Sequence, residues 1–374
     1  MADLQDELHP TTEVGAPDEL PEPFPAPAPA PAPPARDRDA PCLDRARALL
    51  AGHPVADGYC GLLSALRGLP WYDLETGESA LDTDVPRLRE GRVGALFWSL
   101  HLPEAVTGDR AMSATLERLD LLRAVVRAHP EGLRLADTAG EISDARSCGR
   151  IAVLPGPAGA AALADSLAVL RSLRVLGLRV LTLSGTSWAS GAGLTRFGEE
   201  VVREMNRLGV LADLSGASEA TIRRVLAASK APVLCTRSAA RALRPHPANL
   251  PDELLAALGA AKGLCMVPLA AEQTGPTVRD VADHLDHVRR VAGPESVALS
   301  GTYDAGTAHP QELGDTSGYP RLVAELLERG WPETEVALLT WGNVQRVLRG
   351  ADFTARAAQL RRPPSTATLA ETDG

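Results

Sequence analysis

The sequence predicts an α/β protein built as a (β/α)8 TIM barrel, and three observations favour that architecture. Eight short apolar runs are spaced along the chain, segments of helical period separate many of them, and 374 residues are enough for one such domain with tails. Short, continuous apolar runs are typical of strands that are buried on both faces. Strands that alternate with helices favour a parallel sheet with the helices outside it.

The eight candidate strands follow one another at intervals that leave room for helical crossovers. The first strand is the weakest candidate, because it is short and is interrupted by Asp57. The predicted strands are residues 54–59, 92–100, 150–155, 179–184, 209–215, 231–237, 263–269 and 296–304.

Amphipathic helices are expected between the strands, because apolar residues recur there at intervals of three and four. Two more helices follow the last strand and are expected to pack outside the barrel. The clearest helical segments are residues 161–177, 197–209, 218–230, 278–293, 319–330 and 341–350.

The composition divides the chain into three parts. Residues 1–43 contain "PEPFPAPAPAPAPPARDRDAP", which cannot build a core, so we expect a disordered, proline-rich tail. Residues 44–355 are the predicted barrel. Residues 356–374 are polar, and we expect this C-terminal tail to be frayed.

Charge and composition exclude several classes of partner. The net charge of −10 argues against nucleic acid or an anionic membrane surface. No run of 18 apolar residues predicts a membrane span, and the N-terminal segment lacks the apolar region of a secretory signal. The five cysteines form no CxxC pair, which fits a reduced compartment. We expect a cytoplasmic protein, and the preference for arginine and alanine suggests a bacterial source.

In a barrel of this kind, chemistry takes place where the strands end, at their carboxyl termini. A hydrolytic metal site needs His, Asp or Glu side chains there, and Asp304 is the only residue of those types at the strand ends given below. Those ends supply Tyr59, Gly61, Pro155, Ser184, Gly185, Ser215, Gly216, Thr236, Arg237, Thr302, Tyr303 and Asp304.

Six stretches, spread over about residues 47 to 350, resemble the membrane (renal) dipeptidase family of zinc-dependent enzymes. This resemblance implies an amidohydrolase-like barrel, a binuclear zinc centre and hydrolysis of dipeptides. The stretches are "GALFWSLHLP", "DSLAVLRSLRVLGLRVLTLS", "GLTRFGEEVVREMNRLGVLADLSGAS", "ADHLDHVRRVAG", "SGYPRLVAELLERGW" and "WGNVQRVL".

The resemblance also locates the positions at which the family binds zinc. The family's first-strand motif, Asp-Gly-His-x-Asp, is "DGYCG" here, so Tyr59 and Gly61 stand where the resemblance places two ligands. The bridging glutamate falls on Pro155. The two histidines of the second zinc fall on Gly216 and Arg237.

The same comparison implies that the substrate-binding and catalytic residues are replaced. The histidine of the motif Glu-Gly-Gly-His falls on Ala158, and the substrate-contacting histidine falls on Gly185. The arginine that binds the substrate carboxylate falls on Ala248, and the catalytic aspartate falls on Thr302.

We therefore predict a non-hydrolytic pseudoenzyme with no metal cofactor. Two bridged zinc ions need about five anionic or imidazole ligands, and the residues at these positions supply none of comparable quality. Such a protein would act by binding a small molecule or by subunit pairing. Because the family forms dimers, a homodimer or a heterodimer with an active dipeptidase paralogue is expected.

Two alternatives stay open. The chain could be a repurposed, zinc-independent enzyme that acts on a small molecule in a biosynthetic pathway. It could also be an ordinary metallodipeptidase, as transfer from the family would suggest, although a fold alone does not establish an activity. For a repurposed site the candidate pocket residues are Tyr59, Arg237, Thr302, Tyr303 and Asp304.

Arg237 brings a fixed positive charge to the former metal site, and a buried cation needs an anionic partner. We expect Asp304 or Asp213 to pair with it, in which case the site is a structural plug. If neither carboxylate reaches Arg237, the guanidinium can bind a small anionic ligand.

Overall fold

The structure is a computed structural model, and it describes residues 40–69, 72–77 and 80–374. Most of the predicted disordered tail, residues 1–39, lies outside the described residues. The last residues of that tail, from Ala40 onward, already belong to helix α1, Ala40–Gly52.

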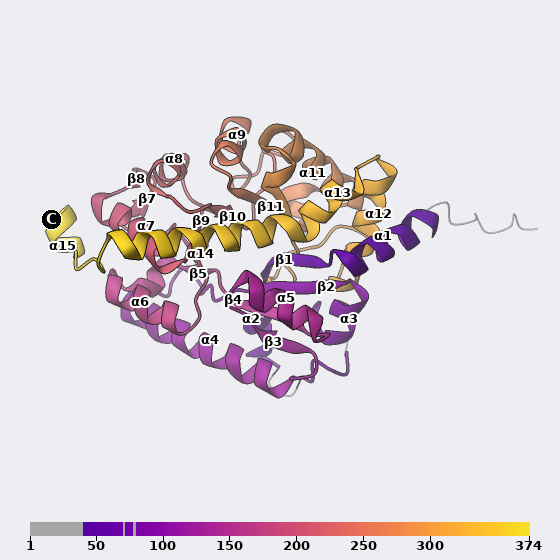
Figure 1. The fold of residues 1–374 in the computed structure, drawn as a ribbon, viewed down its shortest axis with the longest axis horizontal. Coiled ribbons are helices and arrows are strands. Elements are labelled where there is room, and N and C mark those ends of the chain that lie inside the picture. The colour runs from indigo at the N-terminus through magenta and orange to yellow at the C-terminus, as the bar shows by residue number, and fades with distance from the viewer. Residues whose placement is uncertain (1–39, 70–71, 78–79) are drawn as a thin grey trace, which may run out of the picture. The chain divides into compact units, whose positions relative to one another are not determined.

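The predicted (β/α)8 barrel is confirmed, with a parallel strand at each of the eight predicted runs, of which β1 extends one residue beyond its run (Figure 1). Most of the strands are shorter than the apolar runs that contain them. The barrel strands are β1 (Val55–Cys60), β2 (Val93–Trp98), β4 (Ile151–Pro155), β6 (Val180–Thr182), β9 (Leu211–Asp213), β10 (Leu234–Cys235), β11 (Leu264–Pro268) and β12 (Val297–Ser300).

Two seams join the strands into a ring. In the first seam β4 is followed by β5, Ala158–Gly159, which pairs with β6, and the amide of Arg179 donates to the carbonyl of Pro155 at 3.0 Å. In the second seam Cys60 and Tyr303 form a parallel bridge between the ends of β1 and β12. The amide of Gly61 donates there to the carbonyl of Tyr303 at 2.7 Å.

Four short strands among the described residues were not predicted: β5, which is described above, and β3, β7 and β8. β3, Leu133–Leu135, pairs with β4 outside the ring, and β7 (Ala189–Ser190) forms a hairpin with β8 (Gly193–Leu194) after β6. These elements are two or three residues long, which is too short to show an alternating or apolar pattern.

Helices cover the outside of the barrel, as expected for crossovers between parallel strands (Figure 1). None of the described helices is both long and apolar enough to cross a membrane. The helices after α1 are α2 (Leu62–Leu66), α3 (Val85–Glu90), α4 (Gly108–Ala128), α5 (Ala139–Ser147), α6 (Leu167–Val175), α7 (Arg196–Leu208), α8 (Glu219–Ala228), α9 (Asp252–Ala260), α10 (Ala271–Thr274), α11 (Val278–Ala292), α12 (Tyr319–Glu328), α13 (Glu333–Ala337), α14 (Asn343–Arg361) and α15 (Leu369–Asp373).

The core has two layers. One layer packs the strands against the surrounding helices and includes Cys60, Cys235 and Cys265. The other gathers alternate strand residues with small or branched side chains and the apolar face of α14, for example Val344 and Leu348. α14 runs across the strands in Figure 1 and so covers one end of the barrel, which leaves the carboxyl ends of the strands as its mouth.

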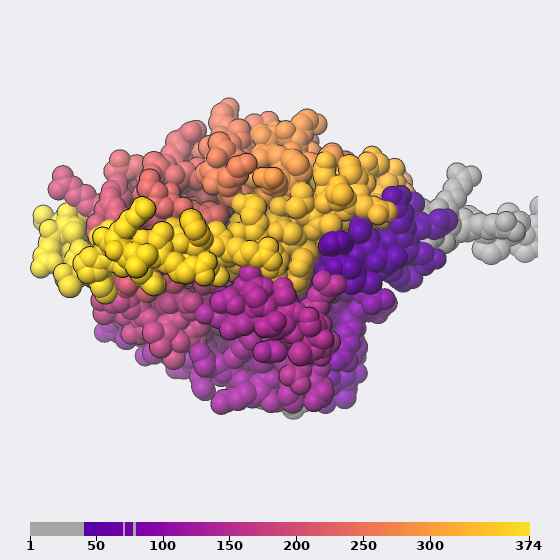
Figure 2. Space-filling view, in the orientation of Figure 1, coloured from indigo at the N-terminus to yellow at the C-terminus, as the bar shows by residue number. Residues whose placement is uncertain are grey.

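The C-terminal end is not frayed as expected. α14 continues past residue 355 to Arg361, and the residues after it follow α7 (Figure 2, yellow). The hydroxyl of Ser365 donates to Glu200 at 3.0 Å, and the carboxylate of Asp373 accepts from the amide of Phe197 at 3.1 Å. The polar side chains of this segment hold it to α7 through hydrogen bonds, which composition alone does not reveal.

Candidate functional site

A cavity of about 670 Å³ lies at the mouth of the barrel, where several strands end. Its walls come from the ends of β1, β2, β6, β9 and β10, and from the start of α4. The lining residues are Tyr59, His101, Leu102, Pro103, Glu104, Val106, Thr107, Thr115, Gly159, Ala160, Ala161, Ala162, Ser184, Gly185, Ser215, Gly216 and Arg237.

Arg237 lies over the ring of Tyr59 in this cavity. The central guanidinium carbon is 4.4 Å from the ring centroid, which is the geometry of a cation–π contact. The backbone amide of Arg237 donates to the Ser215 hydroxyl at 2.9 Å. Its side-chain Nε is buried and has no hydrogen-bond partner. Within the described residues, no carboxylate forms an ion pair with this guanidinium, so the expected structural plug is absent.

Asp213 does not pair with Arg237 because its carboxylate is already used. Oδ1 accepts from the amide and hydroxyl of Ser215, at 3.2 and 2.8 Å, and from the amide of Thr236 at 2.8 Å. Oδ2 accepts from the hydroxyl of Thr182 at 2.6 Å. This buried side chain therefore connects the ends of β6, β9 and β10 and holds the backbone next to the cavity in place.

Asp304, the other expected partner, is held by the loop around Asp82. The two residues exchange hydrogen bonds: the amide of Asp82 donates to Asp304 at 2.9 Å, and the amide of Asp304 donates to Asp82 at 3.1 Å. Burial raises the pKa of Asp304 to about 6. Tyr303 is fully buried, with its hydroxyl donating to the carbonyl of Leu313 at 3.1 Å. Neither residue lines the cavity, and neither does Thr302, so the five candidate pocket residues are not all brought together.

His101 lines the cavity and was missed by the sequence analysis. It comes three residues after the end of β2, and its ring centroid is 5.8 Å from that of Tyr59. Its Nδ1 is 3.2 Å from the hydroxyl of Ser99. Burial and the neighbouring charge of Arg237 lower the pKa of His101 to about 3, so the imidazole is neutral. Its position in the sequence could have identified it, because His101 is an ionisable residue directly after the second predicted strand, residues 92–100.

The residues at the positions that the resemblance assigns to zinc ligands do not fit zinc. A Cβ atom built on Gly61 would lie 2.3 Å from the backbone oxygen of Asp304, so a carboxylate cannot be placed there without moving that backbone. Pro155 is a buried strand residue with no side-chain donor atom. Arg237 is a cation. Among the described residues, no group of three His, Cys, Asp or Glu side chains is arranged to hold a metal ion.

Two other positions are open rather than filled. Gly185 and Gly216 have φ values of +74° and +73°, and a Cβ built on either meets nothing within 4 Å. Ala248 lies away from the cavity, with its amide donating to Nδ1 of His246 at 3.2 Å.

Fold and site define a parallel (β/α)8 barrel with its candidate site at the carboxyl ends of the strands. Residues 43–362 match the family described as membrane dipeptidase, peptidase family M19. The chain therefore belongs to this family, as the resemblance implied.

Named relatives and a solved structure agree with this assignment. Dipeptidase 3 of Mus musculus is 39% identical over 329 residues, which cover 82% of this chain and 66% of the mouse protein. Dipeptidase verJ of Clonostachys rogersoniana is 34% identical over 338 residues, covering 82% of this chain and 86% of that protein. A metallo peptidase from Rhodobacter sphaeroides, solved with a phosphinate mimic of the dipeptide L-Ala-D-Ala, has a TM-score of 0.72 at 25% identity and covers 80% of this chain and 99% of its own.

The chain thus spans about two thirds of the length of the mouse relative.

Proposed function

We propose that this chain is a non-hydrolytic member of the dipeptidase family that binds a small anionic molecule at the barrel mouth. The observation that carries the proposal is the position of Arg237. Its guanidinium lies 4.4 Å from the Tyr59 ring, in a cavity of about 670 Å³, and no described carboxylate pairs with it. The resemblance places a zinc-binding histidine at this residue, so a fixed cation replaces a metal ligand.

The charge of Arg237 supports an anionic ligand on physical grounds. A guanidinium that is partly removed from water loses hydration, and it regains that free energy when it binds a carboxylate or phosphate through two parallel hydrogen bonds. The buried Nε atom has no partner, and buried donors are nearly always satisfied. An oxyanion that approaches the Nε edge would satisfy it.

The absence of hydrolysis follows from the same residues. Hydrolysis of a peptide bond needs an activated water, which the family obtains from its zinc centre as the resemblance implies. The positions of Gly61, Pro155 and Arg237 do not fit that centre. His101 is a weak base, because its pKa is lowered to about 3.

The first experiment measures metal content and peptidase activity. After exposure to excess zinc and desalting, the purified chain should hold well under one zinc ion and should not hydrolyse a panel of dipeptides. The 39% identity to a protein named Dipeptidase 3 favours the opposite outcome. Stoichiometric zinc together with hydrolysis would establish an ordinary metallodipeptidase and would overturn the proposal.

The second experiment measures binding of simple anions by calorimetry. Acetate and inorganic phosphate are titrated at constant ionic strength into the wild-type chain and into Arg237→Gln. At least one of the two anions should bind saturably to the wild type, with at least a tenfold loss in the variant. Arg223→Gln is the matched control, because Arg223 is an exposed arginine on α8 outside the cavity. Equal loss in both variants would point to a general charge effect and not to a site.

A further inference from the structure

The mouth cavity continues into a second pocket. This pocket has a volume of about 510 Å³ and shares Ser184, Gly185 and Gly216 with the first. Its remaining lining comes from the β7–β8 hairpin and the start of α8. These residues are small, and several carry hydroxyl groups: Thr186, Ala189, Ser190, Gly191, Ala217 and Ser218. A ligand held at Arg237 therefore has room to extend toward a wall that is polar and uncharged.

The charges around Arg237 favour one negative charge on the ligand. Arg237 is the only basic residue among the described lining residues whose charge is fixed, since His101 is neutral. Glu104 lines the same cavity, and the buried carboxylate of Asp213 lies close enough to affect the pKa of His101. Arg118 also affects the pKa of His101, but its guanidinium donates to the carbonyl oxygen of His101. The two carboxylates offset these two cations, so a second negative charge on a ligand would meet no further cation and would be repelled by Glu104 and Asp213.

His101 offers a hydrogen-bond donor rather than a charge. Its own amide donates to the Ser99 hydroxyl at 3.1 Å, so that oxygen already accepts one hydrogen bond. Among the described residues, the hydroxyl proton of Ser99 has one partner, Nδ1 of His101, at 3.2 Å. A hydroxyl that donates to Nδ1 leaves the proton of the neutral ring on Nε2. In that tautomer the imidazole presents an N–H group to the cavity.

We propose, on the basis of the function proposed above, that the ligand is a small hydroxylated monocarboxylate. Its carboxylate accepts hydrogen bonds from Arg237 and from Nε2–H of His101. Its hydroxyl-bearing body occupies the pocket beside the β7–β8 hairpin, where small side chains leave space and hydroxyl groups supply partners.

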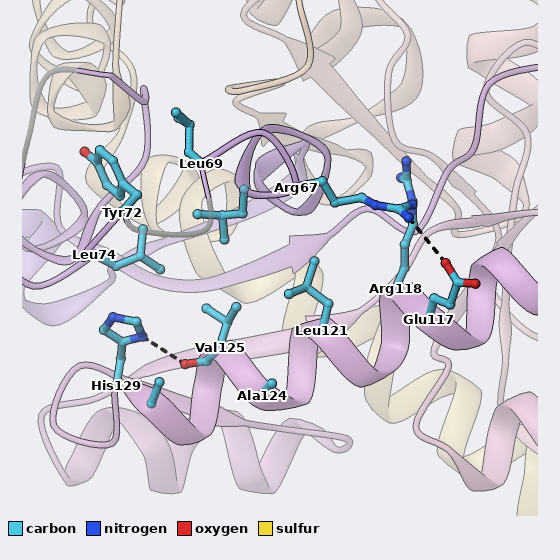
Figure 3. A pocket seen from close by; sticks show the side chains of 12 residues that line it. Arg67, Leu69, Tyr72, Leu74, Glu117, Arg118, Leu121, Ala124, Val125 and His129 are labelled. Carbon is cyan, nitrogen blue, oxygen red and sulfur yellow. Dashed lines mark hydrogen bonds and ion pairs between the residues drawn. The ribbon is translucent and has the colours of Figure 1, made fainter.

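A pocket elsewhere in the molecule differs from the mouth cavity in its charges and its lining. It lies between α2 and α4 and has a volume of about 530 Å³ (Figure 3). Figure 3 shows Leu121 and Val125 of α4 pointing toward the segment that carries Arg67 and Leu69, and Arg67 is paired with Glu117 at 3.3 Å. Of its two arginines, Arg67 has this carboxylate partner and Arg118 donates to the carbonyl oxygen of His101, and much of the lining is apolar, so the pocket gives no comparable anion site.

The test compares four probes by calorimetry on the full chain: D-gluconate, acetate, succinate and inorganic phosphate. Gluconate should bind at least tenfold more tightly than acetate, because only gluconate has hydroxyl groups for the second pocket. Succinate and phosphate should bind at least tenfold more weakly than gluconate, because they carry additional negative charge. Equal binding of gluconate and acetate, or tighter binding of succinate or phosphate, would overturn the proposal.

Two variants locate the contacts. Gly191→Leu places a side chain in the second pocket, where a Cβ meets nothing within 4 Å, and should weaken gluconate at least tenfold while acetate is unchanged. Gly52→Leu is the matched control, at an exposed glycine of α1 that is equally open. His101→Phe keeps an aromatic ring beside Tyr59 but removes the donor, and should weaken gluconate and acetate alike by about fivefold. An unchanged affinity in either Gly191→Leu or His101→Phe would contradict the assigned contact.

The outcomes separate this inference from the function on which it rests. If phosphate binds best and is lost in Arg237→Gln, the anion site stands and the monocarboxylate is wrong. If none of the four probes binds, both proposals fail.

Discussion

The two sides of the barrel mouth have changed in opposite ways. On the side of β1 and β12, Gly61 is packed against the backbone of Asp304 and Ala305, so the space that a ligand side chain would need is filled by main chain. On the side of β6 and β9, Gly185 and Gly216 face open space. On the first, closed side, main chain fills the space beside Gly61, whereas the second, open side borders the cavity.

The closed side is also held together by buried carboxylates. Asp57 is fully buried, and its Oδ1 accepts from the amide of Tyr59 at 3.0 Å and from that of Gly301 at 2.6 Å. It thereby connects β1 with the end of β12. The open side has Asp213 in the equivalent role for β6, β9 and β10. The difference teaches that glycine serves opposite purposes on the two sides of the mouth: at Gly61 it allows close packing of the main chain, and at Gly185 and Gly216 it leaves space in the cavity.

The largest expected effect is at Gly61. Gly61→Ala places a Cβ 2.3 Å from a backbone oxygen, so the 304–305 backbone must move, and we expect a loss of about 3 kcal/mol in the free energy of unfolding. Gly216→Ala is the control, because its Cβ has room and only its φ of +73° opposes the substitution, at about 1 kcal/mol. Urea denaturation measures both. Equal losses would show that the two sides do not differ.

This comparison also bears on attempts to restore the metal site. Gly61→Asp would place its Cβ against the same backbone as Gly61→Ala. Gly216 has space for a side chain, but Gly216→His alone should not produce dipeptide hydrolysis. One imidazole cannot hold a binuclear centre.

The second prediction concerns the pH dependence of the closed side. Burial raises the pKa of Asp57 from 3.8 to about 6 in the folded protein. Its proton is therefore bound more tightly in the folded state, and the stability that this gives is present below pH 4 and is lost as the pH rises through 6. Asp57→Asn keeps an oxygen acceptor and removes the titration.

Relative to the wild type, Asp57→Asn should gain about 2 kcal/mol in stability between pH 4.5 and pH 7. The measurement is the free energy of unfolding of both proteins at the two pH values. The same measurement on Asp213→Asn compares the effect of removing a buried carboxylate on the open side with its effect on the closed side. A difference between Asp57→Asn and the wild type that does not change with pH would show that Asp57 is charged throughout.

The sequence was sufficient to predict the barrel, because strands buried on both faces are continuous apolar runs, and each of the eight runs contains a strand. It did not reveal β3 or the β7–β8 hairpin, which are defined by pairing and not by pattern. The C-terminal segment was expected to fray because its residues are polar. Ser365 and Asp373 are satisfied instead by partners on or beside α7, which are distant in sequence.

The site was predicted only in part. Tyr59 and Arg237 were expected at the mouth and are found there together. The partner of Arg237 was not predictable, because the hydrogen bonds that occupy Asp213 and Asp304 depend on side-chain directions at neighbouring strand ends. The place of His101 in the cavity depends on the pairing of β1 with β2, which brings its ring close to that of Tyr59.

The smallest expected effect concerns the cation of the open side. Arg237→Leu should change the free energy of unfolding by less than about 1 kcal/mol, because the guanidinium contributes a cation–π contact with Tyr59 and no ion pair among the described residues. Arg179→Leu is the matched comparison. Arg179 is fully buried and paired with Asp352 at 2.8 Å, so its loss leaves a carboxylate without its partner and should cost about 3 kcal/mol. Urea denaturation of the wild type and of the two variants at pH 7 measures both losses in the free energy of unfolding. If Arg237→Leu costs as much as Arg179→Leu, the guanidinium is paired in solution and the open side is a plug after all; a small cost together with loss of anion binding leaves the cavity as the functional half of the mouth.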